Sequence, residues 1–172
     1  MKRTFILIFS AIALLQSCAS QIYMEPQELN TAIQSDEFSF VAKRANPTNY
    51  AVINTINSIP NSTATRILEL STGYGLSLKK NLLEVNLPYF GRAYKASTNP
   101  SEIGYRFASK DFYLKKSAGK NGKTIYTFEP NDNTAIRRIS IEIYPSGSAM
   151  VSVDSNDRQP ITYDGYLEKF KK

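Results

Sequence analysis

The sequence predicts a mainly β protein, built as a single antiparallel up-and-down sheet of about nine strands with one short N-terminal helix. Three observations support this. The 172-residue chain has 11 Tyr, 9 Phe and no Trp, an aromatic profile that favours strands. Apolar and polar residues alternate through much of the C-terminal half. Turn-forming residues separate these runs at close spacing, and strands joined so tightly run antiparallel.

The first seventeen residues are typical of a lipoprotein signal peptide. Lys2 and Arg3 precede an apolar run over 5–15, which is too short to span a membrane and fits the hydrophobic region of a secretory signal. The run ends in the sequence LQSC, which resembles the bacterial lipobox. The lipobox implies cleavage before Cys18, a diacylglyceryl group on its sulfur and a further acyl chain, such as palmitate, on its amine.

Cys18 is the only cysteine, and two other interpretations of it are weaker. A buried structural cysteine does not fit the edge of a segment that should not enter the fold. A catalytic thiolate needs a neighbouring base such as His, and the sequence contains no His. We therefore expect a signal peptide over 1–17, a lipidated tether over 18–24 and a single β-rich domain over 25–172. The tether spans at most about 25 Å.

The residues after Cys18 predict the compartment. Two or three acyl chains hold a protein durably on a membrane. Ala19 and Ser20 follow the cysteine instead of Asp, which in lipoproteins of this type indicates transport to the outer membrane. An acidic run of the kind that directs some lipoproteins to the cell surface does not follow. We expect a lipid-anchored protein of the cell envelope, at the outer membrane and facing the periplasm.

The mature chain opens with a predicted helix from about 25 to 34, with Pro26 in its first turn and Leu29 and Ile33 on one side. A strand over 38–47 follows and ends at a proline. The segment 50–65 is ambiguous: its apolar spacing suits a short helix, whereas its Asn and Ser content and Pro60 oppose one, and we treat it as an excursion.

Nine further strands are predicted from alternation and turn signals. They cover 66–71, 74–79, 82–87, 103–107, 110–117, 122–129, 135–144, 147–154 and 160–168. The last three show the clearest buried faces, carried by Ile139, Ile141, Ile143, Ala149, Val151, Val153, Ile161, Tyr163 and Leu167. A sheet this wide curls towards a barrel, folds into a sandwich or packs under the helix, and a lipocalin-like barrel is among these forms.

The composition excludes much chemistry. Without His and with its one Cys lipidated, the chain lacks the groups for Ser-His-Asp catalysis, thiol chemistry and most zinc or copper sites. The carboxylates, 15 in total, leave only a paired-carboxylate enzyme open. The acidic runs at 131–133 and 154–157 suit hairpin turns better than calcium loops. We expect no enzyme, no cofactor and no metal. The formal charge of +6 lies in separated doublets, which does not favour nucleic-acid binding.

The segment LPYFGRAY, residues 87–94, is the strongest candidate for binding. It places Tyr89, Phe90, Arg92 and Tyr94 where a strand ends and a long connection begins. Tyr and Arg recur in binding hot spots and stack on sugars or peptides. The alternative is that Tyr89 and Phe90 cover the open end of the core.

Three segments together resemble one known family: LPYFGRAY at 87–94, FSFVAKRANP at 38–47 and IYPSGSAMVSVDSNDRQPITYDGYLE at 143–168. With the lipobox, they are similar to small Bacteroidetes envelope lipoproteins grouped as domain of unknown function 4251. The resemblance covers about 36–170. It implies a compact antiparallel β domain anchored in the envelope, and it implies no activity.

These observations favour a non-enzymatic lipoprotein, held to the membrane by its N-terminal lipid, that binds a periplasmic protein or glycan. The first alternative is a lipocalin-like carrier with a small apolar ligand inside the barrel. A more distant one is a carboxylate-based glycan hydrolase. The oligomeric state is left open by the sequence.

Overall fold

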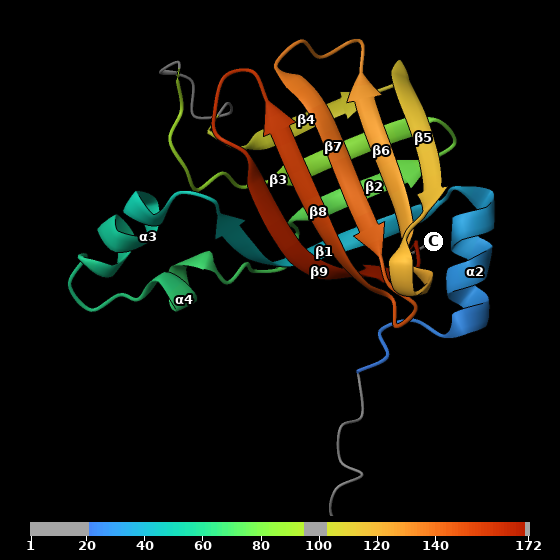
Figure 1. Cartoon of the computed structure of the whole chain (residues 1–172), viewed down its shortest axis with the longest axis horizontal. Helices are drawn as coiled ribbons and strands as arrows, with labels where there is room; N and C mark the ends of the chain where they lie inside the picture. Colours follow the sequence, from blue (N-terminus) through green and yellow to red (C-terminus); the bar gives the residue numbers. More distant parts are fainter. Residues whose placement is uncertain (1–20, 95–102, 171–172) are drawn as a thin grey trace, which may run out of the picture.

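A computed structural model describes residues 21–94 and 103–170. Within them, nine strands form one antiparallel sheet in the order β4-β3-β2-β1-β9-β8-β7-β6-β5 (Figure 1). The predicted mainly β, up-and-down fold is confirmed. The strands are β1 (Phe38–Pro47), β2 (Gly75–Lys79), β3 (Leu82–Leu87), β4 (Tyr105–Ser109), β5 (Phe112–Ala118), β6 (Thr124–Pro130), β7 (Ile136–Ile143), β8 (Ser148–Ser155) and β9 (Ile161–Glu168).

The sheet curls into a nearly closed barrel. Strands β2 to β4 cross behind β5 to β8 (Figure 1), and β1 pairs with both β2 and β9, so the first strand joins the last. The two edge strands, β4 and β5, are consecutive in the chain, and only Lys110 and Asp111 separate them. At this corner the Asp132 carboxylate accepts bonds from Ser109 Oγ at 2.5 Å and from the Lys110 backbone N–H at 3.0 Å. One carboxylate therefore fixes the point where the two edges meet.

The inside of the barrel is filled with side chains. The faces predicted for β7, β8 and β9 are confirmed, because all nine of their alternating apolar residues are buried. Five large aromatic side chains occupy the space between the crossing strands: Phe38, Phe40, Tyr126, Phe128 and Tyr163, each 1% exposed or less. A core of this density leaves the ends and the outer surface of the barrel for any interaction.

Two glycines allow β1 to approach both of its neighbours closely. A Cβ atom on Gly75 of β2 would lie 2.0 Å from the Phe40 carbonyl oxygen, and one on Gly165 of β9 would lie 2.0 Å from the Val41 carbonyl oxygen. The β1–β9 register also shifts between Ala42 and Arg44, where an extra residue bends β1. The strand is therefore bent and tightly flanked at the point where the two layers of the barrel meet.

Helix α2 (Pro26–Ser35) confirms the helix predicted at 25–34 and buries Leu29 against the barrel. Its C-terminal end is held by β6, since the Tyr126 hydroxyl donates to the Ile33 carbonyl at 2.9 Å and to the Asp36 carboxylate at 2.7 Å. Lys116 of β5 pairs with the same carboxylate at 2.9 Å. The helix thus packs against the edge of the sheet formed by β5 and β6.

The prediction of a strand over 66–71 is wrong. The excursion contains two helices, α3 (Tyr50–Asn57) and α4 (Ala64–Leu68), which stand to one side of the barrel in Figure 1. Asn49 accepts from the Ala51 N–H and caps α3, whereas Thr63 accepts from the Arg66 N–H and caps α4. Leu68 turns into the core at the end of α4. Glu69 then forms an isolated bridge with Arg44 of β1, and the Leu70 N–H donates to the Lys43 carbonyl at 2.8 Å. Local capping therefore outweighs the β-favouring composition of this segment.

Two residues assigned to the tether pack against the barrel. The Tyr23 N–H donates to the Ser146 carbonyl at 2.8 Å, and its ring stacks on Tyr166 with centroids 4.8 Å apart. Met24 is 6% exposed and packs on Gly147 in the β7–β8 turn. Cys18 and the predicted signal peptide lie outside the described residues. No helix among the described residues has the length and apolar character needed to cross a membrane.

Replacing Gly165 with Ala is expected to destabilise the domain by about 3 kcal/mol, because the new methyl group collides with backbone that cannot move independently of β1. Urea unfolding of the mature chain, produced without lipid, measures this loss. Ser39→Ala, on the outer side of β1, is the control and should change the free energy of unfolding by less than about 0.5 kcal/mol. A Gly165→Ala protein as stable as the wild type would contradict the proposed constraint.

Candidate functional site

The loop of residues 88–94 leaves β3 and docks on the turn between β8 and β9. The Tyr94 N–H donates to the Asp157 carbonyl at 2.7 Å, and the Gln159 N–H donates to the Arg92 carbonyl at 3.1 Å. Between these bonds, Ala93 and Arg158 form an isolated antiparallel bridge. This short backbone pairing, over residues separated by about 65 positions in the chain, fixes the loop in one place.

Tyr89 and Phe90 are half-buried against the core, as the alternative interpretation of this segment proposed. The Tyr89 hydroxyl donates to the carbonyls of Arg92 at 3.0 Å and Gln159 at 3.1 Å, and its ring meets Tyr105 edge-on at 5.7 Å. The buried Tyr163 hydroxyl donates to the Pro88 carbonyl at 2.7 Å. These contacts make Tyr89 and Phe90 a cover over one end of the barrel.

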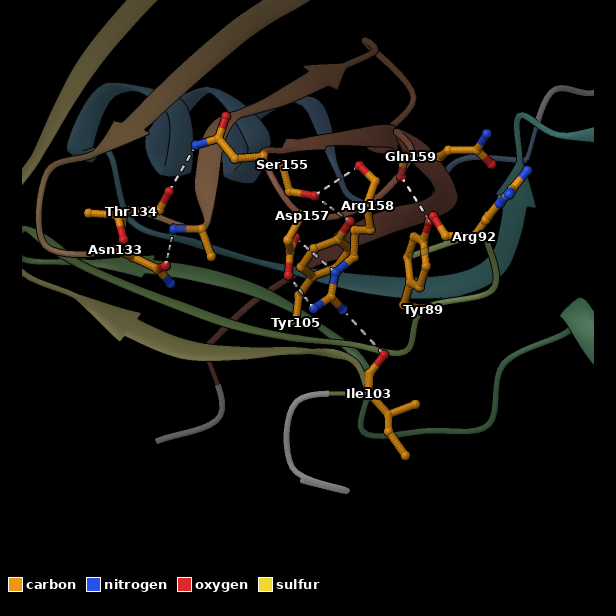
Figure 2. A network of polar contacts seen from close by, with 12 residues as sticks. Tyr89, Arg92, Ile103, Tyr105, Asn133, Thr134, Ser155, Asp157, Arg158 and Gln159 are labelled. Atoms are coloured by element: carbon orange, nitrogen blue, oxygen red, sulfur yellow. Dashed lines mark hydrogen bonds and ion pairs between the residues drawn. The ribbon is translucent and has the colours of Figure 1, made fainter. Parts of the chain in front are cut away.

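Arg158 is the centre of the polar network at this end (Figure 2). Its guanidinium lies 5.1 Å from the ring centroids of both Tyr89 and Tyr105 and donates to the Asp157 carboxylate at 2.7 Å. A further hydrogen bond reaches the Ile103 carbonyl at 3.4 Å. The side chain is only 11% exposed. A planar cation in contact with both rings, and bonded to the Asp157 carboxylate and the Ile103 carbonyl, holds the loop, the turn and β4 together.

The protonation states of this network are fixed near neutral pH. The hydrogen bond from Arg158 holds the pKa of the Asp157 carboxyl below its ordinary value of 3.8. Burial raises the pKa of Tyr105 to about 12 and also raises the pKa of Tyr89. Asp157 therefore stays ionised and the two tyrosines stay neutral. A cluster with these charges suits a structural or recognition role better than proton transfer at neutral pH.

Arg92 and Tyr94, unlike Tyr89 and Phe90, point away from the core. Tyr94 is 63% exposed and Arg92 is also exposed. A third segment reaches the same turn, because Asn49 donates to the Gln159 side chain at 3.2 Å. The next residue, Tyr50, is 81% exposed. We call Tyr50, Arg92 and Tyr94 the distal surface. The structure therefore divides the predicted binding loop into a buried half and an exposed half.

Sequence reasoning did not identify Arg158, Tyr105 or Tyr50. Arg158 lies in a polar turn that looks solvated, and its burial results from a loop that folds over it from far away in the chain. Tyr50 lies in the segment whose structure the sequence left open. Within the described residues, no group of three or more Cys, His, Asp or Glu side chains is placed to hold a metal ion.

The model of one protein family matches residues 21–167 of the chain, and that family is described as Domain of unknown function (DUF4251). The chain belongs to the DUF4251 family. The match begins just before the docked Tyr23 and ends within β9, so the DUF4251 domain includes the complete barrel interior, the distal surface and the Arg158 network.

Among solved structures, the chain is similar to a crystal structure of a DUF4251 family protein from Bacteroides eggerthii DSM 20697. The two share 13% sequence identity, with a TM-score of 0.48, and the comparison covers 83% of this chain and 85% of that one. No curated protein gives a significant match.

Replacing Arg158 with Lys keeps the positive charge beside Asp157 but removes the planar group between the two rings. We expect the amide protons of Tyr94 and Gln159 to exchange about tenfold faster, since a partly buried cation–π contact contributes about 1–2 kcal/mol. Hydrogen exchange followed by NMR measures the change. Arg137→Lys is the matched control, because Arg137 pairs with Asp154 outside the network. Equal exchange rates in the Arg158→Lys and wild-type proteins would show that the stack does not hold the loop.

Proposed function

We propose that the chain is a lipid-anchored, non-enzymatic binding module of the bacterial cell envelope, which presents its distal surface to a protein partner in the periplasm. Cys18 supplies the anchor in the outer membrane. The domain contributes a rigid support, and Tyr50, Arg92 and Tyr94 contribute the contact.

The tether and the distal surface contact opposite ends of one strand, β8, and this placement is the main support for the proposal. Tyr23 is bonded to the turn before β8, whereas Tyr94 is bonded to the turn after it. A strand of eight residues is roughly 25 Å long. An anchor attached through Tyr23 therefore leaves the distal surface on the opposite end of β8, directed away from the membrane.

The chemistry of the distal surface suits a protein partner. Tyr and Arg are enriched among the residues that dominate protein interfaces. The backbone at Arg92 and Tyr94 is already paired with the β8–β9 turn. Binding therefore costs little additional ordering of the loop, which favours affinity.

The packed barrel interior favours this function over carriage of an apolar ligand. A carrier needs an enclosed cavity of a few hundred Å³. Here Phe40, Tyr126 and Tyr163 are each fully buried between the two layers and occupy that space. In the Arg158 network, the pKa of Asp157 lies below its ordinary value and the pKa of Tyr105 is about 12, so neither group titrates near neutral pH. These protonation states favour recognition over acid–base catalysis.

Photo-cross-linking in intact cells tests the distal surface. Tyr94→Ala and Arg92→Ala should each lower the recovery of the cross-linked partner about tenfold, because truncation of a hot-spot residue costs more than about 1 kcal/mol. Tyr113→Ala is the matched control, since Tyr113 is a 58% exposed tyrosine on β5, outside this surface. If the distal variants capture the same proteins in the same amounts as the control, the distal surface is not the binding site.

The anchor has a separate test. Cys18→Ala removes the sulfur that the lipid requires, so the variant should move from the detergent-rich to the aqueous phase in detergent phase separation of cell extracts. The wild-type chain should stay in the detergent-rich phase, and Ser17→Ala, which keeps the cysteine, is the control. A Cys18→Ala protein that still partitions with detergent would rule out lipid attachment at this residue.

A further inference from the structure

The outer face of the sheet carries a groove that lies apart from the distal surface. It crosses β4, β3, β2, β1 and β9, is open to solvent and has a volume of about 850 Å³. We call it the outer groove. A volume of this size lies within the range of sites for small molecules and short oligomers.

Strand register builds the outer groove from two parallel rows of outward-facing residues. The first row runs Ala108, Glu84, Ser77, Ser39, Glu168 across the five strands. The second runs Arg106, Asn86, Gly75, Val41, Tyr166. In the first row two serines lie between Glu84 and Glu168, and in the second Gly75 and Val41 lie between Asn86 and Tyr166. The floor is therefore low over β2 and β1, and the walls rise on β3 and β9.

The walls of the groove are polar and partly fixed in place. Ser77 donates to the Glu84 carboxylate at 3.2 Å, and Arg106 Nε donates to the Asn86 side chain at 3.3 Å. Asn86 in turn donates to the Gly73 carbonyl at 2.8 Å. Glu168 stands on the opposite wall, about 14 Å from Glu84 across three strand spacings. Carboxylate, amide, hydroxyl and guanidinium groups thus face one hollow.

Two further features distinguish among ligand classes. Strands β1, β2, β3 and β9 are paired on both sides, so their backbone groups cannot add a peptide strand and recognition over these four strands depends on side chains. The charges on the walls are of both signs, Glu84 and Glu168 against Arg106, which favours a neutral ligand over a strongly charged one. Two aromatic side chains line the groove: Tyr74, and Tyr166, whose ring stacks on Tyr23 and lies under the Lys43 ammonium. Dense hydrogen-bonding groups beside aromatic rings match a polyhydroxylated ligand.

We propose that the outer groove binds a neutral oligosaccharide, whose hydroxyl groups bond to Glu84, Asn86 and Glu168 while its rings lie over Ser39 and Ser77. The proposal involves binding alone, with no bond made or broken. It is independent of the distal surface, and the two sites can be tested separately in one protein.

NMR titration of the mature chain, produced without lipid, tests the proposal with three neutral hexasaccharides: cellohexaose, maltohexaose and chitohexaose. We expect at least one of them, at about 10 mM, to shift the amide resonances of Ser39, Ser77 and Glu84, which detects a Kd of about 1 mM or tighter. The amides of Tyr94 and Gln159 should stay unshifted. If none of the three sugars shifts the groove resonances, the outer groove is not an oligosaccharide site.

Variants of the floor and the wall locate the bound sugar. Ser77→Tyr fills the floor and should weaken binding at least about tenfold. Ser152→Tyr is the matched control, because Ser152 also faces outward on an internal strand, β8, but lies outside the groove. Glu84→Gln leaves the shape unchanged and should weaken binding about tenfold by removing a charged acceptor. Equal weakening by Ser77→Tyr and Ser152→Tyr, or full affinity in both groove variants, would overturn the proposal.

The proposals for the distal surface and for the outer groove can be contradicted independently of each other. Tyr94→Ala should bind the hexasaccharide with wild-type affinity, whatever its effect on partner capture. A sugar that loses affinity in Tyr94→Ala but not in Ser77→Tyr would place the sugar at the distal surface and overturn the assignment to the outer groove.

Discussion

The close flanking of β1 by β2 and β9 is the constraint on which the rest of the structure depends. At Phe40 and Val41, both neighbouring strands come so near that neither Gly75 nor Gly165 can carry a side chain. This approach, together with the bend after Ala42, turns the sheet over on itself. Phe38 of β1 then meets Tyr126 of the opposite layer edge-on, with ring centroids 5.1 Å apart, and the interior closes around them. Without this close approach, the sheet would stay open and its apolar face would lack a partner.

Because side chains fill the interior of the barrel, its ends and its outer face are the surfaces that a partner or ligand can reach. At one end the cover provided by Tyr89 and Phe90 needs a fixed position, and Arg158 provides it by stacking against Tyr89 and Tyr105 while pairing with Asp157. The backbone of Arg92 and Tyr94 is bonded to the β8–β9 turn, and their side chains lie outside the barrel. The exposed half of the loop is therefore a consequence of the buried half. Closure of the core and exposure of the surface proposed for partner binding are two results of one local arrangement.

The parts of the fold that depend on short-range periodicity could be predicted from the sequence, as could the family. Alternation identified the buried faces of β7, β8 and β9, and the proline and apolar spacing identified α2. The strand predicted at 66–71 was wrong because capping by Thr63 and burial of Leu68 outweigh residue preference there. Arg158 could not be found because its burial depends on contacts between distant segments. The outer groove could not be predicted for a related reason, because its residues become neighbours only through the pairing register of five strands.

Tyr166 connects the tether to the outer groove. Its ring stacks on Tyr23 at 4.8 Å, with the two planes 9° apart, and the same side chain lines the groove beside Val41. The Tyr23 N–H is bonded to the β7–β8 turn, so the stack cannot rotate freely about the chain. The segment from Cys18 to Tyr23 can span at most roughly 18 Å. An anchor at Cys18 would therefore hold the groove close to the membrane and the distal surface far from it, so that the two proposed sites meet different surroundings.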